Sequence, residues 1–497
     1  MSERGTKKEP IPQIKKAHEN SNRQQIKYYI CNRQQNSSAD ELTTDEFQKK
    51  HSHMKFYNRK EELEILHEVQ RQSFNDHSRF TVVTGRRRVG KTKLILNSCE
   101  NSPTVYLFVA RKNEGELCEK FSQVISRSLE MHFSDGSGSF INIFTSLMEL
   151  GKYRNFNLII DEFQEFFYIN ESVFSEIQDI WDRYKDNTHV NLIVSGSVYT
   201  LMHRIFKNAR EPLYGRADRH LKIMPFTTEV LKDILSEFNP NYTNDDLLAL
   251  YTFTGGVPKY VELLLEAGAF TMSDMVDFMI RPGSFFLDEG DYLLIQEFGK
   301  KYGNYYSILA SIASGRNTMA EILSLFTGGS IGGQMKRLED DYAVVNRKRP
   351  ILSKEGTQNV RYEIADNFLR FWFRYINRNQ EFIEAGNLRG LAELIKSDYP
   401  TYSGMVLERY FRQKLSEQMI YRNIGSWWET SKGKDTTQNE IDIVAIYTDN
   451  KKVLIGEVKR QRKNFKPELL QQKAELLRTK LFFKHEIETR CFTIEDM

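Results

Sequence analysis

The sequence is short of cysteine, of excess charge of either sign, and of long apolar runs. Its four cysteines show no C-x-x-C spacing, which offers no zinc site and fits a reducing compartment. The 70 Lys and Arg residues nearly balance the 67 Asp and Glu residues, so the net charge of +3 argues neither for nor against a nucleic-acid partner. No apolar run is long enough to cross a bilayer and no signal peptide is recognisable, so we expect a soluble, cytoplasmic protein without a membrane partner.

The length of the chain indicates several domains, because 497 residues exceed what one hydrophobic core organises. A hydrophobic fraction of 40%, with 33 Phe and 24 Tyr, can supply several cores. Residues 1–53 are polar and carry no apolar period, which predicts a disordered leader. The abrupt change in composition makes Met54 the expected natural start, with a basic nucleic-acid arm as the alternative interpretation of the upstream segment.

Residues 80–96 read FTVVTGRRRVGKTKLIL, which is a β-branched strand, a glycine-rich loop and a short helix. The loop is G-x-x-x-x-G-K-T, the pattern of a phosphate-binding loop. Its backbone N–H groups must close around phosphate oxygens, so glycines keep side chains out of the way, and the positive end of the helix faces the anion. The lysine then reaches the β and γ phosphates, and the threonine hydroxyl ligates Mg²⁺. The predicted nucleotide-binding residues are Gly85, Arg86, Arg87, Arg88, Val89, Gly90, Lys91 and Thr92.

A second apolar strand, at residues 157–160, ends in two carboxylates, Asp161 and Glu162. In this arrangement the first acid holds the Mg²⁺ shell and the second polarises the attacking water. A further strand at residues 190–194 ends at Ser195, whose hydroxyl suits a sensor of the γ-phosphate. Strands that alternate with helices predict a parallel sheet with its site at the carboxyl edge. With ATP and Mg²⁺ as cofactors, the predicted catalytic residues are Lys91, Asp161, Glu162 and Ser195, and the predicted metal ligands are Thr92 and Asp161.

Several motifs around the loop together resemble the archaeal-type ATPase family, a branch of the AAA+/STAND P-loop ATPases. They are F-x-x-R-x-x-E-L from Phe56, GRRRVGKT, LIIDEFQE, VSGS, PLYGRA and TGGVPKY, and they cover about residues 54–267. The resemblance implies an AAA+-like core over residues 54–226 and a helical lid over residues 227–290. It also makes Ser195 the candidate for the sensor-1 residue.

The same resemblance gives Arg216, in PLYGRA, the role of an arginine finger or a phosphate-sensing arginine. A structural arginine in a turn is the alternative. The arginine would act in its own chain or on a neighbouring subunit, so a homo-oligomer stays open. Where AAA+ motors carry a sensor-2 arginine, this chain has GGVPK from Gly255, which resembles the STAND branch and argues against a processive motor.

Residues 300–365 read as three short helices followed by two strands, which predicts a winged helix. Basic residues Arg347, Lys348 and Arg349 suit contact with DNA phosphates. The third helix also carries acids, and winged helices often serve as protein-packing modules, so packing is the alternative. The aromatic run DNFLRFWFRY opens residues 366–400 and resembles the segment that follows the winged helix in this family, with packing between domains as its expected role.

Residues 401–497 carry a second set of chemical groups. Glu408 lies on a helix expected from Gly404, residues 426–428 open a strand, and two further strands carry the acids and the lysine of an E…D…E-x-K order. This order resembles the PD-(D/E)XK nuclease fold. The acids on adjacent strands can face the same side and share a divalent metal, while the lysine orients a water. The candidate residues are Asp442 and Glu457 as metal ligands, with Lys459 and Glu408 in support.

The sequence thus predicts an α/β protein with an AAA+-like P-loop core, a parallel sheet, a helical lid, a winged helix and a C-terminal restriction-endonuclease-like domain. Its expected function is ATP hydrolysis coupled to DNA binding or cleavage, with DNA met by the winged helix and the C-terminal domain. The alternative is a nucleotide-dependent switch or scaffold that binds a protein partner. In that alternative the nuclease fold is inactive, and ordinary charges on a strand explain the acids.

Overall fold

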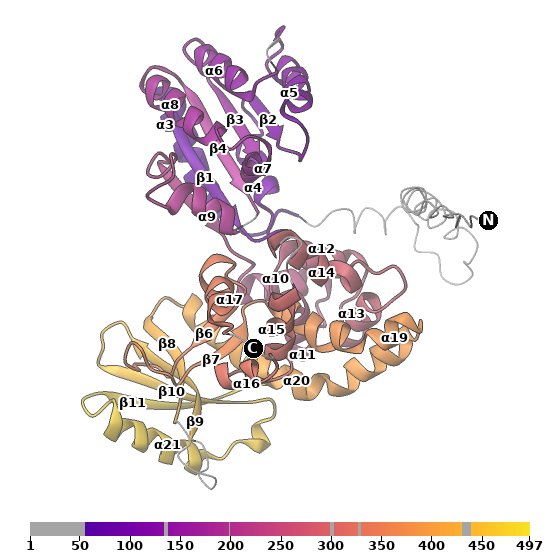
Figure 1. The fold of residues 1–497 in the computed structure, drawn as a ribbon. Helices are drawn as coiled ribbons and strands as arrows, with labels where there is room; N and C mark the ends of the chain where they lie inside the picture. The colour runs from indigo at the N-terminus through magenta and orange to yellow at the C-terminus, as the bar shows by residue number, and fades with distance from the viewer. Residues whose placement is uncertain (1–54, 134–137, 198, 299–302, 327–329, 430–438) are drawn as a thin grey trace, which may run out of the picture. The chain divides into compact units, whose positions relative to one another are not determined.

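The computed structural model describes residues 55–133, 138–197, 199–298, 303–326, 330–429 and 439–497 (Figure 1). Within the chain, Met54–Met497 forms one compact unit, distinct from Met1–His53. The expected disordered leader and the start at Met54 lie outside the described residues, as does the Gly328-Gly329 pair within the winged-helix stretch. Among the helices of the described ranges, none is both long and apolar enough to span a membrane.

A five-stranded sheet of order β2-β3-β4-β1-β5 forms the core, and all of its strand pairs are parallel. The two central strands β3 and β4 are buried along their whole length, because helices cover both faces of the sheet. The expected parallel sheet is therefore confirmed. Its strands are β1 Arg79–Gly85, β2 Thr104–Phe108, β3 Phe156–Asp161, β4 Val190–Gly196 and β5 Arg219–Ile223.

Two hydrophobic clusters fix the helices against this sheet, the upper region of Figure 1. One face packs α3 (Lys60–Asn75) and α4 (Lys91–Ser98), with Val83 and Ile193 in their cluster. The other face is rich in aromatic side chains, with the rings of Phe80 and Trp181 5.3 Å apart. The helices of this second face are α5 Glu114–Ser128, α6 Phe140–Leu150, α8 Val173–Tyr184 and α9 Tyr199–Lys207; the sequence analysis did not anticipate α6 or α8.

Five helices follow the core where a helical lid was expected. They are α10 Thr228–Phe238, α11 Asn244–Thr254, α12 Pro258–Glu266, α13 Met272–Met279 and α14 Phe285–Phe298. Thr243 and Thr271 begin α11 and α13 with reciprocal hydrogen bonds to acids three residues on, which satisfies the free amides of each first turn. The last helix runs eight residues beyond the expected lid boundary at residue 290.

Three short helices and an antiparallel strand pair occupy the expected winged-helix stretch. They are α15 Gly303–Ala313, α16 Met319–Leu323 and α17 Gly332–Lys336, then β6 Val345–Lys348 and β7 Arg361–Ile364. A π-helical turn, Arg337–Asp341, continues α17. One hydrophobic cluster joins the lid, these helices, the aromatic connector and one face of the C-terminal sheet. The proposed boundaries at residues 300, 366 and 401 therefore do not separate independent cores.

The aromatic connector packs against the lid as expected. Trp372 donates its indole N–H to Leu287 O at 2.8 Å, and its ring covers Gly290 so closely that an added Cβ would lie 2.1 Å from it. The connector consists of α18 Asn367–Phe371, a π-helical turn Trp372–Ile376, and α19 Gln380–Glu384. A single 30-residue helix, α20 Leu388–Glu417, then enters the C-terminal domain, so the helix that carries Glu408 begins well before the expected Gly404.

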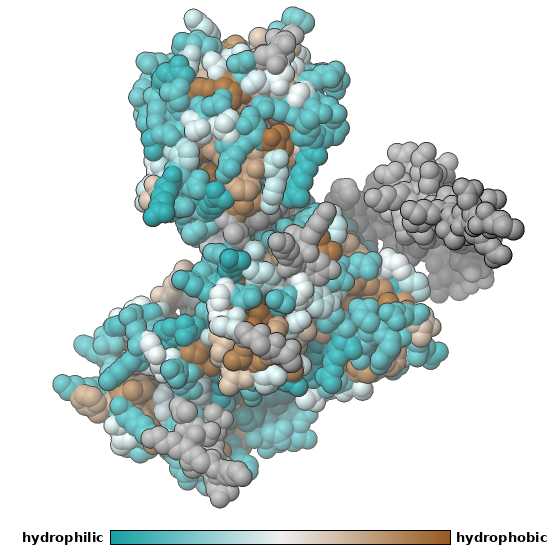
Figure 2. Space-filling model, in the orientation of Figure 1, coloured by the Kyte–Doolittle hydropathy of each residue, from teal (hydrophilic) through white to brown (hydrophobic). Residues whose placement is uncertain are grey.

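The C-terminal sheet has four strands in the order β11-β10-β9-β8, with β8, β9 and β10 antiparallel and β11 parallel to β10. Residues 426–428 end β8 rather than open it, because two irregularities in the β8–β9 pairing hide the alternation of the earlier residues. The elements are β8 Tyr421–Trp428, β9 Glu440–Tyr447, β10 Lys452–Lys459, α21 Pro467–Lys480 and β11 Glu486–Thr493. Hydrophilic residues cover most of the face seen in Figure 2.

Candidate functional site

The phosphate-binding loop begins where β1 ends. Gly85 lies so close to β5 that an added Cβ would be 2.7 Å from Ile223 O, and Gly90, with φ 90°, precedes the first residue of α4. Both positions therefore require glycine. Arg88 between them also has a left-handed backbone, with φ 67°. A glycine-rich loop of this kind and the helix start that follows it offer backbone amides for anion binding.

Lys91 is buried at the head of α4 and folds back over the loop. Its Nζ donates to Gly85 O at 2.9 Å and to Arg86 O at 3.2 Å. Burial lowers the pKa of Lys91, although the nearby carboxylates of Glu162 and Asp161 work in the opposite direction. These carbonyl contacts occupy the ammonium group that the sequence assigns to the nucleotide phosphates.

Asp161, at the end of β3, gathers three hydroxyl groups. One carboxylate oxygen accepts from Thr92 Oγ1 at 2.7 Å and from Tyr106 OH at 2.8 Å, and the other accepts from Ser195 Oγ. Burial, followed by the charge of Asp161, raises the pKa of Tyr106, so its hydroxyl stays a donor. The adjacent Thr92 hydroxyl and Asp161 carboxylate are hard oxygen donors that fit Mg²⁺, whose remaining positions water and phosphates fill.

Glu162 follows with a left-handed backbone, φ 55° and ψ 41°. Ser197 Oγ donates to its two oxygens at 2.8 and 3.0 Å, and Gln164 Nε2 donates to one of them at 2.6 Å. These contacts fix the carboxylate beside the loop. The sequence analysis missed Ser197 and Tyr106 as partners of the two acids; the only signal for each is a hydroxyl close to the carboxyl end of a buried strand.

A cavity of about 370 Å³ joins these groups, a volume within the range of small-ligand sites. Loop residues and Glu162 line one part of it, and aromatic and lid residues line the other. Arg59 is the arginine of the F-x-x-R-x-x-E-L motif, and the sequence analysis gave it no role in the site. It donates to Met224 O at 2.6 Å and lies over the Phe226 ring. The lining residues at the end away from the acids are Lys55, Phe56, Tyr57, Arg59, Phe226, Pro258, Lys259 and Glu262.

The three arginines of the loop contact other parts of the molecule with their side chains. Arg86 forms an ion pair with Asp366, the N-cap residue of α18, and Arg87 lies 4.9 Å from the centre of the Tyr292 ring on α14. Arg88 pairs with Glu289 of α14 at 2.8 Å. The backbone of these residues is thus the part left for phosphate, in keeping with the chemistry of the motif.

Arg216 lies away from the loop of its own chain. It precedes β5, which runs parallel to β1 with Thr81 opposite Arg219, so it sits near the amino edge of the sheet. The loop follows the carboxyl edge, where Gly85 lies four residues beyond Thr81, or about 13 Å further along β1 at roughly 3.3 Å per residue. Its guanidinium pairs with Asp182 of α8 at 3.1 Å. The structure therefore does not bring Arg216 together with the other predicted catalytic residues.

The acids of the C-terminal sheet do come together. The β9–β10 register pairs Ile443 with Gly456, which sets Asp442 opposite Glu457 on one face. Lys459 Nζ donates to Glu457 Oε1 at 2.7 Å, and Lys473 Nζ, from α21, donates to Oε2 at 3.0 Å. Burial acts to lower the pKa of Lys459, but the hydrogen bond and charge of Glu457 outweigh burial, so the pKa is raised overall.

Asp442 is the most perturbed of these groups. Its Oδ2 accepts the Val458 amide at 2.8 Å, and burial, then the carboxylates of Glu408 and Glu457, raise its pKa to about 7. Arg412 donates to Glu408 Oε2 at 3.4 Å and to Asp442 O at 2.9 Å. In the described part of the chain, no three His, Cys, Asp or Glu side chains converge as a ready metal site. The oxygens suit Mg²⁺ in kind, but a metal at Glu457 has to displace a lysine.

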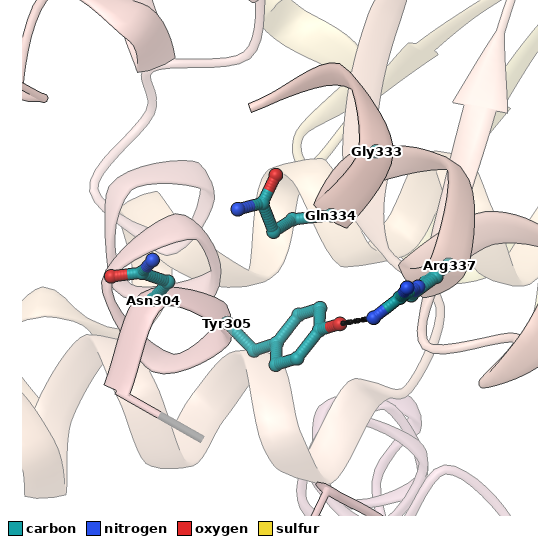
Figure 3. A pocket seen from close by; sticks show the side chains of 5 residues that line it. All are labelled: Asn304, Tyr305, Gly333, Gln334 and Arg337. Carbon is teal, nitrogen blue, oxygen red and sulfur yellow. Dashed lines mark hydrogen bonds between the residues drawn. The ribbon is translucent and has the colours of Figure 1, made fainter. Parts of the chain in front are cut away.

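The winged-helix residues give two surfaces. Figure 3 shows Asn304, Gln334 and Arg337 around a hollow of about 340 Å³ between α15 and α17, where Arg337 donates to Tyr305 OH at 3.3 Å. On the wing, Arg347 and Arg349 are exposed, whereas Lys348 turns inward and pairs with Glu363 at 2.6 Å. Burial lowers the pKa of Lys348 to about 8. Lys348 thus already has a carboxylate partner, and its contact with DNA stays a prediction.

Comparisons with known proteins agree with this geometry. A family model described as an ATPase domain predominantly from Archaea matches residues 56–264, and one described as archaeal and bacterial proteins of unknown function matches residues 372–473. An uncharacterised protein of Methanocaldococcus jannaschii is 32% identical over 414 residues, which cover 81% of this chain and 87% of that relative.

Solved structures resemble the chain at lower identity. A Walker-type ATPase of Pyrococcus abyssi has a TM-score of 0.50 at 18% identity, covering 64% of this chain and 96% of that one. The ORC2 protein of Aeropyrum pernix has a TM-score of 0.42 at 11% identity, covering 70% and 97%. The parallel sheet and phosphate-binding loop define the class as a P-loop ATPase. The chain belongs to the family of ATPases found predominantly in Archaea, as the sequence analysis expected.

Proposed function

We propose that the chain binds ATP with Mg²⁺ in the cavity beside the phosphate-binding loop and hydrolyses the γ-phosphate bond there. Lys91 leaves the loop carbonyls and contacts the β and γ phosphates, while Glu162 orients the attacking water. Thr92 and Asp161 hold Mg²⁺, which neutralises the charge that develops on the phosphates. Ser195 acts through Asp161, since it donates to that carboxylate.

One observation supports this proposal above the others. Thr92, from the loop, and Asp161, from the neighbouring part of the sheet, are 69 residues apart in sequence and share a 2.7 Å hydrogen bond. A hydroxyl and a carboxylate held together at the end of a phosphate-binding loop form the protein half of a Mg²⁺–nucleotide site. Glu162 lies beside them in the same cavity, so a water-orienting group is present as well.

Two substitutions test the assignment of steps to residues. Lys91→Ala should abolish nucleotide binding, because the buried ammonium is the main charge for the phosphates. Glu162→Gln should retain binding and lose turnover, because it removes only the carboxylate that orients water. Binding is measured by titration with ADP and ATP, and turnover by phosphate release with and without Mg²⁺ and DNA. Equal turnover in wild type and Glu162→Gln would remove Glu162 from the mechanism.

A second activity is supported by the C-terminal sheet. We infer that Asp442 and Glu457 bind Mg²⁺ or Mn²⁺ there and that Lys459 orients a water which attacks a DNA phosphodiester, with Glu408 supporting the metal. The observation that favours it is the register: the two carboxylates lie opposite each other on adjacent strands, with the lysine two residues along the same face. The winged helix would then hold the DNA through exposed basic residues such as Arg347 and Arg349.

Incubation of the full chain with linear, branched and single-stranded DNA tests this second activity. Asp442→Ala should remove metal-dependent cleavage and leave ATP hydrolysis nearly unchanged, because the two sites use different residues. Glu486→Ala is the matched control, since that exposed acid pairs with Lys452 in the same sheet. If wild type cuts none of these substrates, the C-terminal fold is a binding module and the alternative of a nucleotide-dependent switch with a protein partner gains.

A further inference from the structure

Arg88 is the residue of the phosphate-binding loop with the least favourable backbone. Its φ of 67° lies in the left-handed region, which an L residue with a long side chain seldom adopts. Gly90, two residues on, has φ 90° and needs no such support. Changes of backbone handedness along the loop are what turn successive amides towards one anion. Whatever holds Arg88 in this conformation therefore helps to hold the loop in its phosphate-binding shape.

The lid holds Arg88 at three points. Its guanidinium Nη2 lies 2.8 Å from Glu289 Oε2, and the guanidinium carbon lies 4.1 Å from the centre of the Phe285 ring. Its carbonyl oxygen accepts the Lys259 amide at 3.4 Å. Phe285 and Glu289 are four residues apart on α14 and so share one face of that helix. Arg88 is thus contacted by residues near the N-terminal ends of α12 and α14.

Glu289 is built into the lid rather than exposed on it. The residue is 2% exposed, and its second oxygen accepts the Tyr260 hydroxyl at 2.7 Å. Each carboxylate oxygen therefore has one strong donor, one from the lid and one from the loop. Burial raises the pKa of Glu289, whereas the Tyr260 hydrogen bond and the positive charges of Arg88, Arg87 and Arg86 act in the opposite direction. The Arg88–Glu289 ion pair is therefore one of several contacts that link the lid to the conformation of the loop.

We propose that Glu289 is a positioning residue for the bound nucleotide: by holding Arg88, it keeps the phosphate-binding loop in its binding shape and so affects nucleotide affinity without itself lining the cavity. The inference rests on the proposed binding of ATP at this loop. In this ion pair, the arginine belongs to the loop and the carboxylate belongs to the lid.

Glu289→Gln tests the proposal because glutamine keeps the volume and the acceptor for Tyr260 while removing the charge. The dissociation constants of ADP and ATP should both rise about tenfold, the effect of losing a charge-assisted hydrogen bond. The kcat at saturating ATP should change less than about twofold, since Lys91, Thr92, Asp161 and Glu162 are untouched. In Arg88→Met/Glu289→Gln, the second change should add little to the first, because the two residues act as one unit.

Asp277→Asn is the matched control, an acid-to-amide change on α13 of the lid that breaks a 2.7 Å pair with Lys396. It should leave both dissociation constants unchanged. Unchanged constants in Glu289→Gln, beside a wild type that binds nucleotide, would overturn the inference. So would a fall in melting temperature and kcat with no change in affinity, which is the mark of a purely structural role. A wild type that binds neither ADP nor ATP would instead overturn the proposed ATPase function.

Discussion

The ATPase core and the C-terminal sheet each place carboxylates on buried strands, but they surround them with different donors. Asp161 accepts from three neutral hydroxyls, those of Thr92, Tyr106 and Ser195. Glu457 accepts from two ammonium groups, those of Lys459 and Lys473. A hydroxyl orients a carboxylate and leaves its charge for a cation, whereas an ammonium group neutralises that charge. The same chemical group, a carboxylate, is thus ready for a metal in one region and already paired with cations in the other.

The largest expected effect comes from breaking the hydroxyl-lined site. Thr92→Ala removes both the predicted metal ligand and a 2.7 Å hydrogen bond to Asp161. The kcat of Mg²⁺-dependent ATP hydrolysis should fall by at least about a hundredfold, because metal stabilisation of the transition state is lost. Phosphate release measured over a range of Mg²⁺ concentrations checks this. Thr145→Ala, on α6 of the same domain, is the control, and an unchanged Mg²⁺ dependence in Thr92→Ala would contradict the assignment.

A smaller effect, of opposite sign, is expected at the ammonium-lined site. Lys473→Gln removes one of the two cations on Glu457, so the C-terminal site should bind Mn²⁺ about tenfold more tightly. Calorimetric titration in a Thr92→Ala background isolates this site from the nucleotide site. Lys480→Gln, on the same helix and paired with Glu429 instead, should leave the affinity as it is. Equal or weaker Mn²⁺ binding by Lys473→Gln would show that the lysine does not compete with a metal.

Sequence spacing predicted the parts of both sites that are local in the chain. The loop at residues 85–92, the acids at 161 and 162 and the strand pair at 442 and 457 each follow from residue types a fixed distance apart. The confirmed parallel sheet follows because apolar strands and helices alternate in this stretch. The sequence pattern predicted the C-terminal sheet less completely. Strand β11 was missed, since most of its residues are not buried and its apolar pattern is weak.

Partners that meet only through folding could not be predicted. Tyr106 reaches Asp161 from the neighbouring strand, 55 residues away, and Glu289 reaches Arg88 from a helix some 200 residues further on. No spacing in the sequence links such pairs. Lys348 shows that the sequence also fails to reveal which charges are already paired. It is a basic residue of the wing that suits DNA, yet in the fold it pairs with Glu363. Composition reports which charges exist, and packing decides which of them remain free.

The count of hydroxyls around Asp161 can be reduced without removing a metal ligand. Tyr106→Phe deletes one donor, a 2.8 Å hydrogen bond, and keeps the ring. The kcat/KM for ATP should fall by about threefold to tenfold, the cost of one hydrogen bond to a charged group. Steady-state kinetics check this, with Tyr153→Phe, an exposed tyrosine of the same domain, as the control. A loss as large as that of Thr92→Ala would instead make Tyr106 part of the catalytic set.

The smallest effect is expected for Arg216, which tests whether the nucleotide site is complete within one chain. Its guanidinium pairs with Asp182 near the amino edge of the sheet, while the phosphate-binding loop lies past the carboxyl edge. Because the two edges are too far apart for one side chain to span, Arg216→Ala should change kcat less than about twofold in dilute protein.

A role of Arg216 on a neighbouring subunit predicts a different result. Mixing Arg216→Ala with Lys91→Ala at high concentration would then change the activity per chain, because an intact arginine meets an intact loop only at mixed interfaces. Activity that is independent of mixing and of concentration identifies Arg216 as a structural arginine, whereas a large loss in the dilute variant would contradict the geometry of the sheet.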